Sequence, residues 1–137
     1  MDILGSFTIS ISDSNLDFSK LEQNIGIVPT KIIKKGQLIG KLKNREAPYD
    51  IWLYEIKITN EEDIFEDLAS LLNDLLPYSE YIREISKSYN QVTINCYLRS
   101  DFAQMGFEIT GALITILEKF GLGINFHILS FGGVEDK

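Results

Sequence analysis

One segment of the chain alternates strictly between apolar and polar residues and two others follow the same period of two, and this alternation restricts the fold more than any other feature. The first segment, SFTISIS at residues 6–12, puts Phe7, Ile9 and Ile11 on one face and only serine and threonine on the other. A period of two places successive side chains on opposite faces of a strand. The chain therefore needs a sheet that packs on one side.

The other alternating segments carry aromatic and branched residues. Residues 50–59, DIWLYEIKIT, place Trp52 and Tyr54 on the expected core face and Ile51 and Leu53 on the opposite face. Residues 91–98, QVTINCYL, place Cys96 among apolar residues. A last strand is predicted at residues 123–129, and a strand or hairpin arm at residues 31–40, closed by Gly36 or Gly40.

Four segments have helical patterns. The longest, residues 60–76, has leucines at helical spacing, acids in its first turn and Asn60 as the expected N-cap, and Pro77 ends it. Shorter helices are predicted after the capping residues Asp17 and Thr110, with Gly26 and Gly121 as their left-handed ends, and at residues 79–86.

These elements predict one α+β domain over residues 1–137, because 137 residues suit a single core. We expect a largely antiparallel sheet of about five or six strands with three or four helices packed on one face. Strand, helix, glycine and strand follow one another near both ends of the chain, which is consistent with two related strand–helix–strand halves.

The net charge is −7, from twenty acids and thirteen bases, and this acidity bears on the expected partners. An acidic surface repels nucleic acid and anionic membranes, so we expect a basic protein partner, no nucleic acid and no membrane. The first residues lack the pattern of a signal peptide, and a single cysteine excludes an internal disulfide. These features predict a cytoplasmic protein, and the sequence specifies no oligomeric state.

The segments LDFSKLEQNIGIVPTKIIKKG at residues 16–36 and YDIWLYE at residues 49–55 resemble a known family, as does GALITILEKFGLGINFHIL at residues 111–129. The family is the bacterial domain of unknown function 4279. Its shared features are the Leu-Asp start of the first helix, the passage through Pro29 and Thr30, a Lys-Gly pair and a Trp-bearing strand. The resemblance implies a bacterial α+β protein and no particular chemistry.

Residues 30–45, TKIIKKGQLIGKLKNR, contain six basic residues and no acid. Gly36 and Gly40 lack the spacing of a phosphate-binding loop, and no aromatic residue between Phe18 and Tyr49 could stack on a base. The favoured interpretation is a solvated hairpin whose lysines keep an edge strand from pairing.

Cys96 and His127 are the only thiol and the only imidazole, and the strand patterns place them on opposite faces of a shared sheet. We therefore predict no catalytic dyad, and no spacing of residues indicates a metal or cofactor site. Carboxylates cluster instead before and within the longest predicted helix. These acids compensate the helix dipole, but they also form a candidate surface for a basic partner. They are Glu61, Glu62, Asp63, Glu66 and Asp67.

The function predicted from these features is a non-enzymatic protein-binding module of the bacterial cytosol, with an immunity-type protein that neutralises a basic toxin or effector as its most concrete form. If the acids serve only the helix end, the partner surface is expected at Ile51 and Leu53. The alternative is a small-ligand-binding protein or an enzyme with a pocket between sheet and helices.

Overall fold

The computed structural model describes residues 3–59, 62–100 and 106–130. A five-stranded sheet has the order β2-β5-β1-β6-β7, and a separate two-stranded hairpin consists of β3 and β4. All neighbours in the large sheet are antiparallel except β6 and β7, which are parallel. The strands are β1 (Ile3–Asp13), β2 (Lys31–Ile33), β3 (Leu38–Ile39), β4 (Arg45–Glu46), β5 (Asp50–Lys57), β6 (Gln91–Ser100) and β7 (Ile124–Ser130). The predicted α+β class and the largely antiparallel sheet are confirmed.

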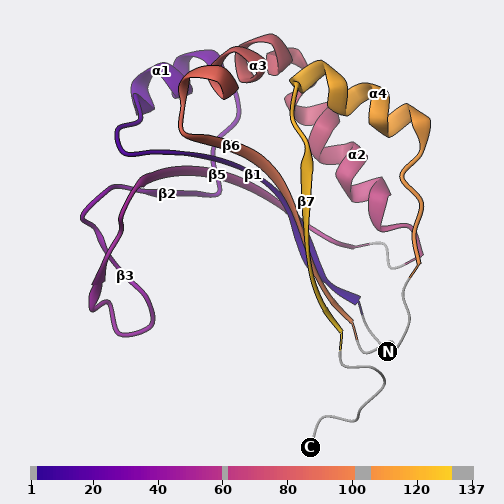
Figure 1. The fold of residues 1–137 in the computed structure, drawn as a ribbon, viewed down its shortest axis with the longest axis horizontal. Helices are drawn as coiled ribbons and strands as arrows, with labels where there is room; N and C mark the ends of the chain where they lie inside the picture. The colour runs from indigo at the N-terminus through magenta and orange to yellow at the C-terminus, as the bar shows by residue number, and fades with distance from the viewer. Residues whose placement is uncertain (1–2, 60–61, 101–105, 131–137) are drawn as a thin grey trace, which may run out of the picture.

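The helices cover one face of this sheet, which is strongly curved, and leave the concave face open (Figure 1). They are α1 (Phe18–Asn24), α2 (Ile64–Leu75), α3 (Ser79–Ser88) and α4 (Gly111–Phe120), with a short 3-10 turn at Leu76–Tyr78. An antiparallel sheet tolerates such an arrangement because alternate side chains can face water.

The alternation of β1 determines which residues form the core. Phe7, Ile9 and Ile11 are fully buried under the helices. Because β1 is the central strand, each of them has a partner on both sides: Ile9, for example, pairs with Tyr54 of β5 and Ile94 of β6. The predicted core face of these three strands is confirmed.

Two of the predicted helix ends are wrong. Helix α2 begins at Ile64 with Asp63 as its N-cap, whose side chain accepts a hydrogen bond from the backbone N–H of Phe65 at 3.2 Å, whereas Asn60 lies outside the described residues. Helix α1 ends in an extended residue, Ile25, so Gly26 is not a left-handed stop. Position 26 requires glycine for a different reason: the Cβ of any other residue would lie 2.5 Å from the Tyr78 hydroxyl oxygen.

The other predicted helix ends are confirmed. Asp17 caps α1 by accepting from the backbone N–H of Lys20 at 3.0 Å, and Thr110 caps α4 by accepting from that of Leu113 at 3.3 Å. Gly121 adopts φ 67° and ends α4, as expected for a left-handed position that favours glycine.

The two strand–helix–strand units differ in topology. In the second unit, β7 lies directly beside β6 and parallel to it. In the first unit, β5 separates β2 from β1. The similar order of elements near the two chain ends therefore does not extend to the same strand placement.

The lysine-rich segment forms an exposed hairpin, as predicted. Gly36 and Gly40 have φ values of 88° and 93°, which supply the turns on either side of β3. The side chains of Lys34, Lys35, Lys41 and Lys43 are exposed.

Asp50 joins this hairpin to the start of α1. Its buried carboxylate accepts hydrogen bonds from the backbone N–H groups of Leu16 at 2.9 Å and Lys35 at 2.7 Å. The hydrogen bond from Lys35, which has the larger effect, and the hydrogen bond from Leu16 hold the pKa of the Asp50 carboxyl below its ordinary value. One side chain thus holds two loops that are far apart in sequence.

Replacing Lys34, Lys35, Lys41 and Lys43 together by glutamine should change the free energy of unfolding by less than about 1 kcal/mol, because exposed charges contribute little individually. Urea denaturation of both proteins at equal ionic strength measures the difference. A loss of several kcal/mol would show that these lysines have structural contacts.

Asp50→Asn should destabilise the fold by about 1–2 kcal/mol at neutral pH, because an amide cannot accept both backbone hydrogen bonds without turning a donor toward one of them. The lowered pKa of Asp50 means that its charge stabilises the fold above the ordinary value of 3.8, and that this contribution is lost as the pH falls through the folded-state value. Denaturation between pH 2 and 7 should show the two proteins converging in stability at the acidic end. A constant difference over this range would contradict the role of the charge.

Candidate functional site

Two aromatic rings lie side by side on the open concave face of the sheet. Tyr97 of β6 and His127 of β7 are register partners, and their rings stack at a centroid distance of 4.7 Å and an interplanar angle of 16°. Tyr97 remains 42% exposed. Both side chains alternate with core residues, so the parallel pairing of β6 and β7 alone brings them together.

Polar side chains continue from these rings toward the centre of the concave face. The buried Asn95 places its Oδ1 atom 3.4 Å from His127 Nε2, and its Nδ2 donates to Thr93 Oγ1 at 3.2 Å. Its neighbour on β1, Thr8, is 2% exposed, and its hydroxyl has no hydrogen-bond partner among the described residues.

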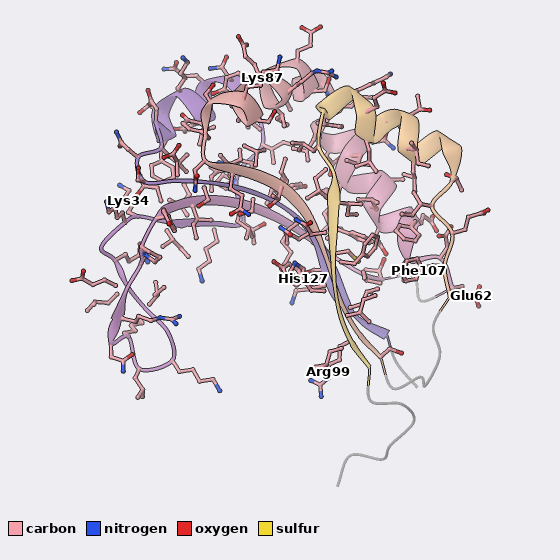
Figure 2. The ribbon with its side chains drawn as sticks, in the orientation of Figure 1. Lys34, Glu62, Lys87, Arg99, Phe107 and His127 are labelled. Atoms are coloured by element: carbon pink, nitrogen blue, oxygen red, sulfur yellow. The ribbon has the colours of Figure 1, made fainter. Side chains whose placement is uncertain are left out.

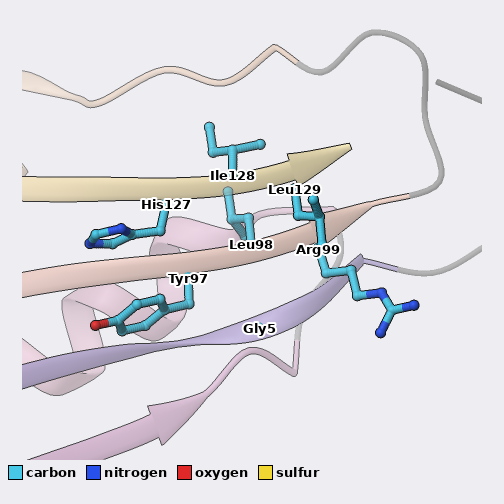
Figure 3. Close-up of a pocket in the computed structure, with 7 residues that line it drawn as sticks. All are labelled: Gly5, Tyr97, Leu98, Arg99, His127, Ile128 and Leu129. Atoms are coloured by element: carbon cyan, nitrogen blue, oxygen red, sulfur yellow. The ribbon is translucent and has the colours of Figure 1, made fainter. Parts of the chain in front are cut away.

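A hollow of about 680 Å³ lies beside the two rings, at the end of the sheet (Figure 3). Gly5 belongs to its wall, and a Cβ at that position would collide with the backbone carbonyl of Tyr97. Leu129, at the rim, is 56% exposed. The hollow is lined by Gly5, Tyr97, Leu98, Arg99, His127, Ile128 and Leu129.

Charge is distributed unequally between the two layers, although each contains bases: Figure 2 shows Arg99 at the end of the sheet, and Lys87 and Glu62 in the helical layer. The described bases of the strands and the hairpin are Lys31, Lys34, Lys35, Lys41, Lys43, Arg45, Lys57 and Arg99. The described acids of these elements are Asp13, Glu46, Asp50 and Glu55. The sheet side is therefore basic, and the excess of acids lies in the helices and their loops.

The concave face itself follows this distribution. Lys31 pairs with Leu53, Lys57 with Ser6, and Glu55 with Thr8, so all three charged side chains belong to the face that carries the serine and threonine row of β1, most of which is buried. Basic residues outnumber the acid on this face, and Arg99 adds to them at the hollow.

The structure separates the predicted partner-binding residues into two groups. Ile51 and Leu53 are half-buried on the concave face, opposite Ser12 and Ser10 of β1. Glu62, Asp63, Glu66 and Asp67 lie at the start of α2 in the helical layer, and Glu61 lies outside the described residues. The acids and the two apolar residues thus do not form one surface.

Two of the acids have roles within the fold. Asp63 is the N-cap of α2. The Asp67 carboxylate accepts hydrogen bonds from the backbone N–H and the hydroxyl of Thr59, both at 3.0 Å, and so attaches the segment after β5 to α2. These contacts account for carboxylates at both positions without a partner protein.

Cys96 and His127 lie on opposite faces of the sheet, as predicted. Cys96 pairs with Phe126, is fully buried and faces the helices, whereas His127 faces the concave side. Burial raises the pKa of the Cys96 thiol to about 12. No group of three or more His, Cys, Asp or Glu side chains that could hold a metal ion occurs within the described ranges.

A second and smaller pocket, of about 380 Å³, lies between α1 and the edge of the sheet at β2. It borders Trp52, whose register partner on β2 is Ile32. Phe18 and Glu22 of α1 and the residues around Pro29 complete its wall.

Sequence reasoning missed the site around Tyr97 and His127. The residues of this site belong to the polar side of the segments QVTINCYL and GINFHIL, and such a pattern is typical of an ordinary solvent-exposed face. Periodicity shows that Asn95, Tyr97 and His127 point away from the core. It contains no information on which strands are neighbours, and only the adjacency of β6 and β7 makes these residues a cluster.

A family model for a domain of unknown function, DUF4279, matches residues 5–131. The chain belongs to the DUF4279 family. The match covers nearly the whole chain and confirms the resemblance drawn from residues 16–36, 49–55 and 111–129. Neither curated proteins nor solved structures provided a match. None of the helices in the described part of this DUF4279 protein is both long and apolar enough to cross a membrane.

We predict that Cys96 of this DUF4279 protein is unreactive while the protein is folded. The raised pKa leaves almost no thiolate at neutral pH, and the thiolate is the nucleophile. Labelling with a thiol reagent at pH 7.5 should be at least about a hundredfold slower than in 6 M guanidinium chloride. Comparable rates in the two conditions would mean that Cys96 is accessible.

Proposed function

We propose that this protein is a non-catalytic binding module of the bacterial cytosol, in which the concave sheet face covers an acidic, convex surface of a protein partner. The observation that carries the proposal is the open face itself, where stacked aromatic rings and half-buried apolar residues are surrounded by basic side chains. An immunity-type role, in which such a module covers the working surface of an effector, is its most concrete form.

The composition of the face favours a protein partner. Aromatic residues are enriched at the cores of protein interfaces, and polar groups form their rims. Tyr97 is well placed as an anchor, because the stacked His127 ring restricts its motion and lowers the entropy that binding would remove. Ile51 and Leu53 extend the apolar area toward the other end of the same face.

The sign of the partner's charge follows from the local charges. Lys31 and Lys57 outweigh Glu55 on this face, and complementary charge accelerates association and selects partners. The basic partner expected from the net charge stays a prediction for the helical layer, where Asp63 and Asp67 already have structural roles.

Single-stranded nucleic acid is a less suitable ligand for the same surface. Base recognition on a sheet uses several exposed aromatic rings, and one face of the Tyr97 ring is already stacked on His127. The acidic helical layer would also repel a long polyanion.

The test is affinity capture from a bacterial lysate, followed by binding measurements with the purified partner. A Lys31→Glu/Lys57→Glu double variant should reduce capture and slow association at least about tenfold, because charge reversal converts attraction into repulsion. A Lys20→Glu/Lys87→Glu double variant, with the same charge change in the helical layer, is the matched control and should bind as the wild type does. Tyr97→Ala should mainly accelerate dissociation.

Thermal denaturation of each variant establishes that it is folded. Equal losses in the two double variants would contradict a role for the concave face. Elution of nuclease-sensitive material in place of a protein would assign the face to nucleic acid and overturn the proposal.

A further inference from the structure

The pocket beside Trp52 has features of a ligand site that the fold does not require. Its volume of about 380 Å³ lies within the range typical of small-molecule sites. Two of its apolar lining residues are unusually accessible, since Val28 is 86% exposed and Ile32 is 40% exposed. Val28 and Ile32 therefore present apolar surface to any molecule that enters, and the buried Trp52 belongs to the same wall.

The wall is held by local constraints. Pro29 disfavours helix at Val28 and keeps the chain extended as it leaves α1. The backbone N–H of Thr30 then donates to the carbonyl of Leu53 at 2.8 Å, which attaches this segment to β5. Gly26 allows the Tyr78 hydroxyl to pack closely against the backbone, where any Cβ would clash. The pocket is therefore formed in the absence of a ligand.

Among the described residues, Glu22 is the only charged one that lines the pocket. Its carboxylate is exposed and makes no hydrogen bond or ion pair with another described residue. The nearest base in sequence on the β2 side, Lys31, belongs to the concave face, opposite to the side of Ile32 and Trp52. A single unpaired carboxylate at an apolar pocket favours a cation with an apolar body.

From this geometry we infer that the pocket between α1 and β2 binds a small amphiphilic amine, with the hydrocarbon part against Trp52 and Ile32 and the ammonium group beside Glu22. This site is separate from the concave face, because Trp52 and Tyr97 belong to opposite faces of the sheet.

Trp52 is the only tryptophan, so its fluorescence reports directly on the pocket. The full chain would be titrated with n-octylammonium, n-octanol and n-octanoate, which share a hydrocarbon tail and differ in charge, all below micelle-forming concentrations. Octylammonium should give a saturable change in Trp52 emission at a concentration at least about tenfold lower than octanol, with octanoate weakest.

Three variants locate the binding. Glu22→Gln should weaken octylammonium binding to the level of octanol and leave octanol binding unchanged, whereas Glu84→Gln on α3 is the matched control with no expected effect. Ile32→Lys, which places a cation at the wall of the pocket on a short edge strand, should abolish the octylammonium response. Tyr97→Ala should leave the octylammonium response unchanged. A failed test of this pocket is therefore distinguishable from a failed test of the concave face.

Circular dichroism melting shows that each variant is folded. In addition, the shift of the Trp52 indole N–H signal in nuclear magnetic resonance spectra detects binding independently of fluorescence. Equal affinities for the three probes, an unchanged response in Glu22→Gln, or no saturable response in either measurement would each overturn the inference.

Discussion

Packing of all the helices on one face of the sheet is the constraint on which the rest of the structure depends. The central strand β1 presents Phe7, Ile9 and Ile11 to the helices and its serines and threonine to the concave face. A shift of one residue in the register would exchange these two sets, which the buried face makes prohibitively unfavourable. The same alternation that forms the core therefore creates the polar concave face, free of helices, on which we place the partner.

The asymmetry of the two faces extends to charge. The helices and their loops carry most of the acids, some of which cap helices or hold loops, whereas the strands and the hairpin carry most of the bases. A net charge of −7 describes neither surface. Charges are screened over about 8 Å at physiological ionic strength, so the local charge of a face determines what approaches it. This is why the partner inferred from the concave face differs from the one inferred from composition.

The two candidate sites depend on opposite sides of the same strands. On the concave side, the β6–β7 pairing assembles Tyr97, His127 and Asn95. On the helical side, the exit from α1 leaves a pocket next to Trp52 that no side chain of the described residues fills. Asp50 holds the loop that precedes α1, through Leu16, and the start of the hairpin, through Lys35. A buried carboxylate that takes no part in either site thus joins these two segments.

Local rules in the sequence determined the strands, the helices and their faces. Alternation identified the core side of β1, β5 and β6. Asp17 and Thr110 begin their helices and Gly121 ends α4, as expected, because capping and periodicity are properties of neighbouring residues. Gly26 was misread because the small residue serves contact with Tyr78, which is distant in sequence. The segments around Pro29 and Trp52 likewise indicated the family to which the chain belongs.

Strand order, in contrast, was decided only by the tertiary structure. Nothing in the local pattern places β5 between β1 and β2 or makes β7 parallel to β6, because pairing partners are selected by long-range packing. The cluster of Tyr97 with His127, the separation of Ile51 and Leu53 from the acids of α2, and the pocket at Trp52 all follow from that order. The sequence by itself determined which way each side chain points, and the tertiary structure decided which side chains meet, because contact between distant segments depends on packing that no local periodicity encodes.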